Sequence, residues 1–316
     1  MNISIVVPLY NESESIPELI ARIEHVMNEC GYSYEVIMVD DGSNDGSWEA
    51  IEHAAAKNTN VHAIGFRRNH GKSAALFCGF RKSVGDVVIT IDADLQDCPE
   101  EIPGLYDMLI NDRLDLVSGW KKKRLDNRFT KNFPSKIYNA TVRIMTGIKL
   151  HDMNCGLKAY RSRVVKSIEV YGEMHRYIPV MAAKAGFTRI GEKAVEHRQR
   201  KYGVTKFGMS RFMNGFLDLL TILFISRFGK KPMHIFGLLG TLMFIVGFLL
   251  AAGLGAQKLY LLSSGIKANL VTDSPYFYIA LTVMIMGTQL FLTGFLAELI
   301  SRNSAERNIY QIDKEF

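Results

Sequence analysis

Two long apolar stretches near the C-terminus constrain the fold of this 316-residue chain more than any other feature. They cover residues 235–257 and 276–297, and neither contains a charged side chain. Each has about the 20 apolar residues that a bilayer-spanning helix needs. Two buried helices of a water-soluble core are the alternative, but they would leave little of the chain to cover them. We therefore expect two transmembrane helices within residues 232–300.

Flanking charges predict how these helices are oriented. Lysines and arginines precede the first stretch and follow the second, at Arg227, Lys230, Lys231, Arg302 and Arg307. Cytoplasmic flanks are enriched in these residues, so both ends are predicted to lie in the cytoplasm, including a tail over residues 301–316. The chain is expected in an inner or plasma membrane. Glycines within both stretches favour a tight hairpin or a homo-oligomer.

Charge and cysteine content restrict the partners and the compartment. The formal net charge of +6 and a pI of about 9.0 indicate anionic partners, namely nucleic acids, nucleotide phosphates or anionic lipids. The 4 cysteines are far apart and form no Cys-x-x-Cys pair. This argues against a disulfide framework or a zinc site and fits a reducing cytosol. The N-terminus leads directly into a strand pattern, so we expect no cleavable signal peptide.

The first 120 residues alternate between strand and helix patterns. Strands are predicted at residues 3–7, 35–39, 61–66, 86–91 and 115–118, and helices at residues 14–30, 47–57, 73–83 and 103–111. This alternation predicts right-handed βαβ units. The predicted fold class is therefore α/β, with a mostly parallel sheet and a Rossmann-like nucleotide-binding half.

Acidic residues follow the strand predicted at residues 86–91 and precede a helix start at Pro99. In an open α/β sheet, ligands bind at the carboxyl ends of the strands. Asp92 and Asp94 are two residues apart, so both carboxylates can converge on one hard cation where the strand ends. Mg²⁺ or Mn²⁺ takes one or two carboxylates together with phosphate oxygens of a substrate. A solvated acidic turn is the alternative interpretation.

Two common phosphate-binding motifs do not fit this chain. The stretch from Gly65 to Ser73 resembles a Walker A loop, but five residues separate its glycines where that motif has four. No Gly-x-Gly-x-x-Gly follows the first strand, so the dinucleotide fingerprint is missing as well. Arg68 and Lys72 follow the third predicted strand, and they either face a diphosphate or belong to the solvated surface.

Polar clusters follow three predicted strands: Pro8-Leu9-Tyr10-Asn11-Glu12, Asp40 to Ser47, and Asp92-Ala93-Asp94-Leu95-Gln96. Together they resemble the family 2 glycosyltransferases, which have a GT-A fold. The chain is most similar to the membrane-anchored branch that transfers a sugar from a nucleotide to a polyprenyl phosphate. Dolichol-phosphate mannosyltransferases and bactoprenol glucosyltransferases belong to this branch. The resemblance extends over essentially the whole chain, including both apolar stretches.

The resemblance implies a role for each cluster. The nucleotide of a nucleotide-sugar donor would contact Pro8, Tyr10, Glu12, Asp41 and Asp92. The family's metal and diphosphate positions match Asp92, Asp94 and Gln96, with Mg²⁺ or Mn²⁺ as the cofactor and Asp94 as a catalytic residue.

Asp152 lies in a segment that resembles the one holding the family's candidate catalytic acid. A general base would have to meet the acceptor oxygen within hydrogen-bond reach. A phosphate acceptor has a second pKa of about 6, so it is already largely ionised at neutral pH and needs a base only weakly. Asp152 therefore either accepts a proton or orients the sugar and stabilises positive charge at the anomeric carbon.

Basic residues form two further groups, and we expect them to bind the phosphate of the acceptor. The groups are Lys121, Arg128, Lys131 and Ser135, followed by His197, Arg198 and Arg200. A solvated basic face is the alternative, and nucleic acid is the competing partner. An amphipathic helix predicted at residues 206–231 favours a membrane surface, and hence a lipid acceptor, over nucleic acid.

These observations predict an inverting, metal-dependent glycosyltransferase. Its cytoplasmic GT-A domain would cover residues 1–205, with a nucleotide half at 1–120 and an acceptor half at 121–205. The expected donor is a UDP-hexose such as UDP-glucose, with GDP-mannose as the alternative. A processive polysaccharide synthase is less compatible, because the chain lacks a Gln-x-x-Arg-Trp motif and further spans. A non-catalytic membrane scaffold is the remaining alternative.

Overall fold

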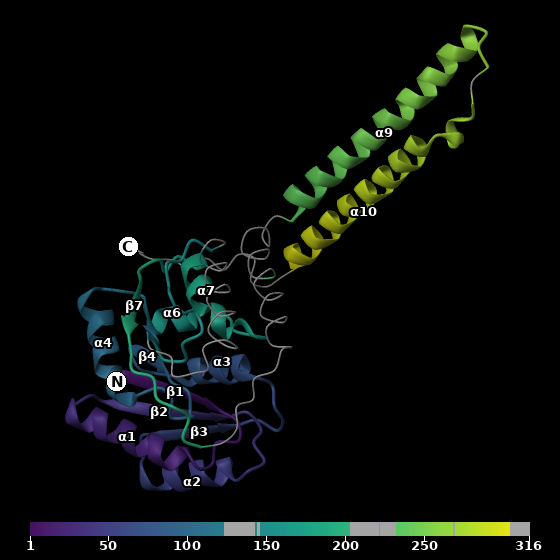
Figure 1. The fold of residues 1–316 in the computed structure, drawn as a ribbon. Coiled ribbons are helices and arrows are strands. Elements are labelled where there is room, and N and C mark those ends of the chain that lie inside the picture. Colours follow the sequence, from purple (N-terminus) through teal and green to yellow (C-terminus); the bar gives the residue numbers. More distant parts are fainter. Residues whose placement is uncertain (123–142, 144–145, 203–220, 222–231, 268, 304–316) are drawn as a thin grey trace. The chain divides into compact units, whose positions relative to one another are not determined.

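The computed structural model describes residues 1–122, 143, 146–202, 221, 232–267 and 269–303 (Figure 1). The chain divides into two compact units, Met1–Ile222 and Leu223–Phe316. The amphipathic helix predicted at residues 206–231 lies outside the described residues except at 221.

One mixed sheet forms the centre of the first unit, with its strands in the order β3-β2-β1-β4-β6-β5-β7. The strands are β1 (Ile3–Leu9), β2 (Tyr34–Asp40), β3 (Val61–Gly65), β4 (Val87–Thr90), β5 (Leu116–Trp120), β6 (Lys158–Arg161) and β7 (Ile190–Ala194). All neighbours are parallel except for the two pairs that β6 makes with β4 and β5. The prediction of a mostly parallel α/β sheet is confirmed, and β6 and β7 are additions to it.

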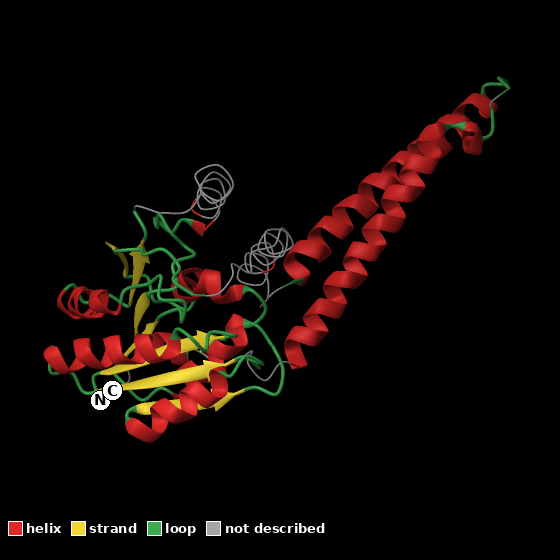
Figure 2. Ribbon diagram, turned by 60° about the horizontal axis from the view of Figure 1, so that its bottom comes forward, coloured by secondary structure: helices red, strands yellow, loops and turns green. Residues whose placement is uncertain are grey.

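Helices cover both faces of this sheet (Figures 1 and 2). Helices α1 (Ile16–Glu29), α2 (Ser47–Lys57) and α4 (Ile102–Asn111) share one apolar core with alternate residues of β1. Helix α3 (Lys72–Lys82) packs on the opposite face, where Gly79 lies against Val6 and Val39. Every residue of β1 and β2 is buried, as expected of central strands that are covered on both faces.

The described part of the first unit also contains four short helical elements. They are η1 (Pro99–Glu101), α6 (Ser162–Lys166), η3 (Met174–Tyr177) and α7 (Ile178–Lys184).

The order of the strands brings the predicted polar clusters together. β1, β2 and β4 are adjacent and parallel, and they end at Leu9, Asp40 and Thr90. Leu9 pairs in register with Asp40, so the segments that follow β1 and β2 leave the sheet side by side. The acidic segment after β4 leaves from the same edge, next to the end of β1.

Two long helices form the second unit and lie side by side (Figure 1). They are α9 (Met233–Ser263) and α10 (Pro275–Asn303), with η4 (Val271–Asp273) between them. By length and composition alone, both are long and apolar enough to cross a membrane. They pack closely through glycines: a Cβ added at Gly240 would lie 2.6 Å from the carbonyl oxygen of Gly287, whereas one added at Gly253 would meet nothing within 4 Å.

We predict that leucine at Gly240 separates α9 from α10, because backbone atoms of α10 fill the space that a side chain needs. In detergent micelles, hydrogen–deuterium exchange of the α9 amides should become roughly tenfold faster in G240L. The matched control is G253L, which adds the same side chain to the same helix and should leave exchange unchanged. Equal exchange in the two variants would show that the contact at Gly240 does not hold the hairpin together.

Candidate active site at the carboxyl edge of the sheet

The side chains of the acidic segment after β4 alternate in burial. Ile91, Ala93 and Leu95 are buried in the core. Asp92, Asp94 and Gln96 lie between them in the sequence and are half-buried. The two carboxylates and the amide are therefore the partly exposed side chains of this segment. The segment then turns at Leu95, which has a φ of 59°, and the N–H of Gln96 donates to Oδ1 of Asp94 at 3.2 Å.

Asp92 forms an ion pair with Lys72, the first residue of α3. Burial alone would raise the pKa of Asp92, but the Lys72 ammonium lowers it below its ordinary value. On its other side, Asp92 lies against the backbone of Gly156, where a Cβ would come within 2.5 Å of Oδ2. Asp92 is therefore held as a carboxylate between two segments that are distant in the sequence.

Asp94 has a different environment, although it is only two residues away. Burial and the neighbouring charges of Asp92 and Asp97 raise the pKa of Asp94 to about 6. Within the described residues, no lysine or arginine forms an ion pair with Asp94. Negative charge therefore accumulates at this point of the site and is incompletely balanced by the protein.

The side chains of Asp92, Asp94 and Gln96 suit a divalent cation that takes few protein ligands. Across the part of the chain that the structure describes, no group of three His, Cys, Asp or Glu residues could hold a metal by itself. Two adjacent carboxylates and one amide oxygen suit Mg²⁺ or Mn²⁺, which complete their coordination with water and substrate phosphate oxygens. The excess negative charge at Asp94 is what such an ion would neutralise.

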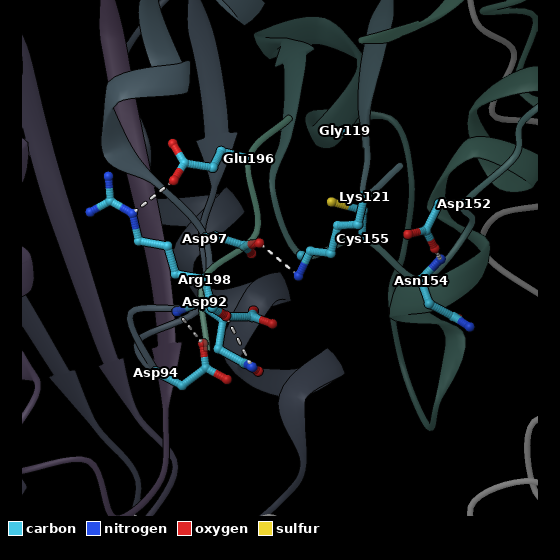
Figure 3. Close-up of polar contacts among 12 residues, drawn as sticks. Asp92, Asp94, Asp97, Gly119, Lys121, Asp152, Asn154, Cys155, Glu196 and Arg198 are labelled. Carbon is cyan, nitrogen blue, oxygen red and sulfur yellow. Dashed lines mark hydrogen bonds and ion pairs between the residues drawn. The ribbon is translucent and has the colours of Figure 1, made fainter. Parts of the chain in front are cut away.

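Asp97 forms a buried ion pair with Lys121, which follows β5 (Figure 3). Nζ of Lys121 lies 2.7 Å from Oδ1 of Asp97, and the Asp97 side chain is fully buried. Burial alone would lower the pKa of Lys121, but Asp97 raises it above its ordinary value. Lys121 was predicted to bind the acceptor phosphate, and in the structure its ammonium already balances a carboxylate. Asp97 is a residue that the sequence analysis did not select.

A segment that follows β7 crosses the site and connects its clusters. Asp97 and His197 form an antiparallel β-bridge, and the N–H of Arg198 donates to the carbonyl oxygen of Gln96 at 2.9 Å. Arg200 forms an ion pair with Glu12, which follows β1. Arg198 pairs with Glu196 at 3.2 Å (Figure 3). The second predicted basic group therefore lies directly over the acidic segment.

The predicted nucleotide residues follow β1 and β2 and are connected to each other. The backbone N–H of Asn11 donates to Ser43 Oγ at 2.8 Å, and that of Glu12 donates to Ser47 Oγ at 2.9 Å. Both carboxylate oxygens of Asp41 accept backbone N–H groups, from His70 at 2.6 Å and from Gly71 at 2.8 Å.

Two further predicted nucleotide residues lie at the same strand end. Pro8 is buried at the end of β1, and Tyr10 is half-buried directly after that strand. Asp41 fixes the loop before α3 through its two hydrogen bonds, while Tyr10 and Glu12 are partly exposed directly after β1.

Asp152 lies in a loop that is fixed by Glu192 of β7. Glu192 Oε1 accepts the backbone N–H groups of His151 at 2.8 Å and of Asp152 at 3.0 Å, while Oε2 lies 2.7 Å from His151 Nδ1. The His151 ring stacks on Trp120 with centroids 4.4 Å apart. Asp152 is almost fully buried, and its Oδ1 accepts the N–H of Asn154 at 3.1 Å. Glu192 was not predicted, because a single acid in a short strand carries no sequence signal.

Three predicted acceptor residues, Arg128, Lys131 and Ser135, lie outside the described residues. The described site therefore contains the acids after β4, the loop at Asp152, and the basic residues Lys121, His197, Arg198 and Arg200.

Comparison with known proteins shows which family the chain is similar to. The family model "Glycosyl transferase family 2" matches residues 4–169. A dodecaprenyl-phosphate galacturonate synthase from Rhizobium johnstonii is 36% identical over 304 residues, which cover 96% of this chain and 88% of the relative. An undecaprenyl-phosphate 4-deoxy-4-formamido-L-arabinose transferase from Pseudomonas fluorescens is 35% identical over 302 residues, which cover 95% of this chain and 84% of that protein.

Solved structures share the fold at low sequence identity. Mannosyl-3-phosphoglycerate synthase from Rubrobacter xylanophilus matches with a TM-score of 0.59 at 16% identity, over 72% of this chain and 75% of that chain. Glucosyl-3-phosphoglycerate synthase from Mycobacterium tuberculosis, in complex with Mn²⁺ and UDP-glucose, matches with a TM-score of 0.53 at 20% identity, over 72% and 78% of the two chains.

The buried pair of Asp97 and Lys121 gives a prediction about stability. Removing either charge leaves the other buried and unpaired, so D97N and K121M should each lower the free energy of unfolding by about 3 kcal/mol. The double variant D97N/K121M should lose markedly less than the sum of the two. Urea unfolding followed by fluorescence measures the three values. Additive losses would show that the two side chains do not depend on each other.

Proposed function

The chain belongs to glycosyl transferase family 2, and from this premise we propose that it transfers a sugar from a nucleotide-sugar to a polyprenyl phosphate. The observation that carries the proposal is the junction of an acidic strand-end segment with a basic segment that crosses it. The first suits the diphosphate and cation of a donor, and the second suits a phosphate acceptor. Relatives named as dodecaprenyl- and undecaprenyl-phosphate sugar transferases support the choice of acceptor.

The donor would lie along the ends of β1, β2 and β4. Tyr10 and Glu12 would face its nucleoside, and Asp92, Asp94 and Gln96 its diphosphate. A bound Mg²⁺ or Mn²⁺ would act as a Lewis acid and offset the charge that develops on the leaving diphosphate. We propose a UDP-linked sugar as the donor, with UDP-glucose as the first candidate and GDP-mannose as the alternative.

The acceptor phosphate would approach from the side of the basic segment. Arg198 and Arg200 can supply planar guanidinium groups for a phosphate, whereas the ammonium of Lys121 already balances the buried carboxylate of Asp97. The phosphate is already largely ionised at neutral pH, because its second pKa is about 6. Asp152 is accordingly assigned to orient the sugar or to stabilise charge at the anomeric carbon. A single displacement on this geometry predicts inversion at that carbon.

The proposed place of reaction is the cytoplasmic face of a membrane. Helices α9 and α10 are long and apolar enough to span it, and the lysines and arginines outside the two spans place both ends in the cytoplasm by the positive-inside rule. A polyprenyl phosphate is confined to the same bilayer, so the anchor and the acceptor belong to one surface.

The test is a transfer assay with the purified full-length protein. It is incubated with radiolabelled nucleotide sugars, undecaprenyl phosphate and Mn²⁺ or Mg²⁺, and the label in the organic phase is counted. UDP-glucose, UDP-galacturonate and GDP-mannose form the donor series. We expect one donor to label the lipid, and no labelling by any nucleotide sugar would contradict the proposed reaction.

Substituting Asp94 tests the proposed metal site within the same assay. D94N keeps the size of the side chain but removes the charge, so transfer should fall by roughly a thousandfold or more. Unchanged circular dichroism would show that the variant is folded. Full activity of D94N, or full activity of the wild type in excess chelator, would rule out the assigned role.

The raised pKa of Asp94 predicts how cation binding depends on pH. Below about pH 6 this carboxyl carries a proton, which a cation must displace, so Mn²⁺ affinity should fall as the pH is lowered from 7 to 5. Above the pKa the carboxylate is already free, and affinity should level off. Mn²⁺ binding followed by electron paramagnetic resonance provides the measurement. D94N is the control and should show a flatter profile.

A further inference from the structure

Among the residues that the structure describes, Lys72 is the one cation that forms an ion pair with a proposed metal ligand. Its ammonium forms an ion pair with Asp92, and both side chains remain about one-third exposed, at 31% and 33%. A partly solvated pair of this kind is worth little in stability, and its partners can separate at small cost. The pair nevertheless occupies a carboxylate that a divalent cation would need. Lys72 and the cation therefore compete for the same oxygen atoms.

The position of Lys72 is set by its surroundings. Asp41 holds the backbone of His70 and Gly71 through two hydrogen bonds, directly before α3 begins at Lys72. Ser73, the next residue, is buried, and its Oγ lies 3.0 Å from His175 Nδ1 and accepts the N–H of His175 at 3.1 Å. The start of α3 is thus fixed on both sides, and only the flexible stem of Lys72 is left to move.

The two aspartates differ in how the charge of Lys72 balances them. Asp92 has a cationic partner, whereas Asp94 has no ion pair among the described residues. One ammonium can neutralise one of these carboxylates but not both. A divalent cation shared by the two would neutralise both, and Lys72 would then lie beside a cation of like charge. A donor diphosphate brought by that cation offers the ammonium a new anionic partner within the same site.

We propose that Lys72 is a resident counter-ion of Asp92 that leaves this carboxylate when the divalent cation binds and then contacts the donor diphosphate. The inference rests on the proposed function, since it assumes the cation and the nucleotide-sugar assigned there. It makes Lys72 a residue that lowers cation affinity in the empty site and raises it when nucleotide is present. Cation and nucleotide binding would thereby be coupled through one side chain.

The experiment measures Mn²⁺ binding to the full-length protein in detergent by electron paramagnetic resonance, with and without UDP. K72M removes the charge and keeps an unbranched apolar stem. Without nucleotide, K72M should bind Mn²⁺ about tenfold more tightly than the wild type, because no ammonium has to be displaced. UDP should strengthen Mn²⁺ binding in the wild type, and this enhancement should be about tenfold smaller in K72M.

Two control variants separate this role from a general effect of charge. K72R keeps a positive charge at the same place and should retain an affinity close to that of the wild type. R68Q removes the charge of an exposed arginine on the loop before α3 and should change Mn²⁺ affinity by about twofold or less, because solvent and salt screen it. Tight Mn²⁺ binding by K72M also shows that this variant is folded.

The outcomes distinguish the two proposals. Equal Mn²⁺ affinities in wild type and K72M, or weaker binding in K72M, would overturn the role of Lys72 while leaving the metal site intact. A tenfold change in the Mn²⁺ affinity of R68Q would also overturn the specific role of Lys72, because it would indicate a general electrostatic effect. Absence of Mn²⁺ binding in the wild type would overturn the metal site of the proposed function and the role of Lys72 together.

Discussion

Three carboxylates within six residues, Asp92, Asp94 and Asp97, set the condition that the rest of the site has to meet. They follow a buried strand, so water cannot fully screen them, and each must be protonated or face positive charge. Lys72 meets this condition for Asp92 and Lys121 meets it for Asp97. Asp94 remains without such a partner in the described residues, and its pKa is raised to about 6. Of the three carboxylates, Asp94 is therefore the one that the described lysines and arginines leave without an ion pair.

The counter-charges come from segments that only the folded chain brings together. Lys72 begins α3, Lys121 follows β5, and the bridge at His197 lies beyond β7. A buried ion pair gives little net stability compared with an apolar pair of the same size. Its effect here is geometric, since it connects the acidic segment after β4 to the end of β5.

The sequence predicted the parts of this arrangement that depend on local pattern. The strands up to Leu116–Trp120 and the helices between them carry periodic apolar residues and appear to within two residues of the predicted ends. Asp92 and Asp94 both lie half-buried directly after β4, which is where the strand pattern predicted them. Asp97 and Glu192 were missed because their roles depend on partners far along the chain, namely Lys121 and the backbone at His151 and Asp152.

Strand β6 shows why such long-range features decide the chemistry. It is short and enters the sheet antiparallel between β4 and β5, which no local periodicity indicates. Thr90 Oγ1 donates to the carbonyl oxygen of Gly156 at 2.7 Å, so the loop before β6 lies against Asp92. Lys72, Arg198 and Arg200 already form ion pairs with acids, so an incoming diphosphate or phosphate that bound them would exchange ion pairs rather than create them. Under the proposed function, exchange between partners of similar strength would let the site bind a highly charged substrate and still release its product.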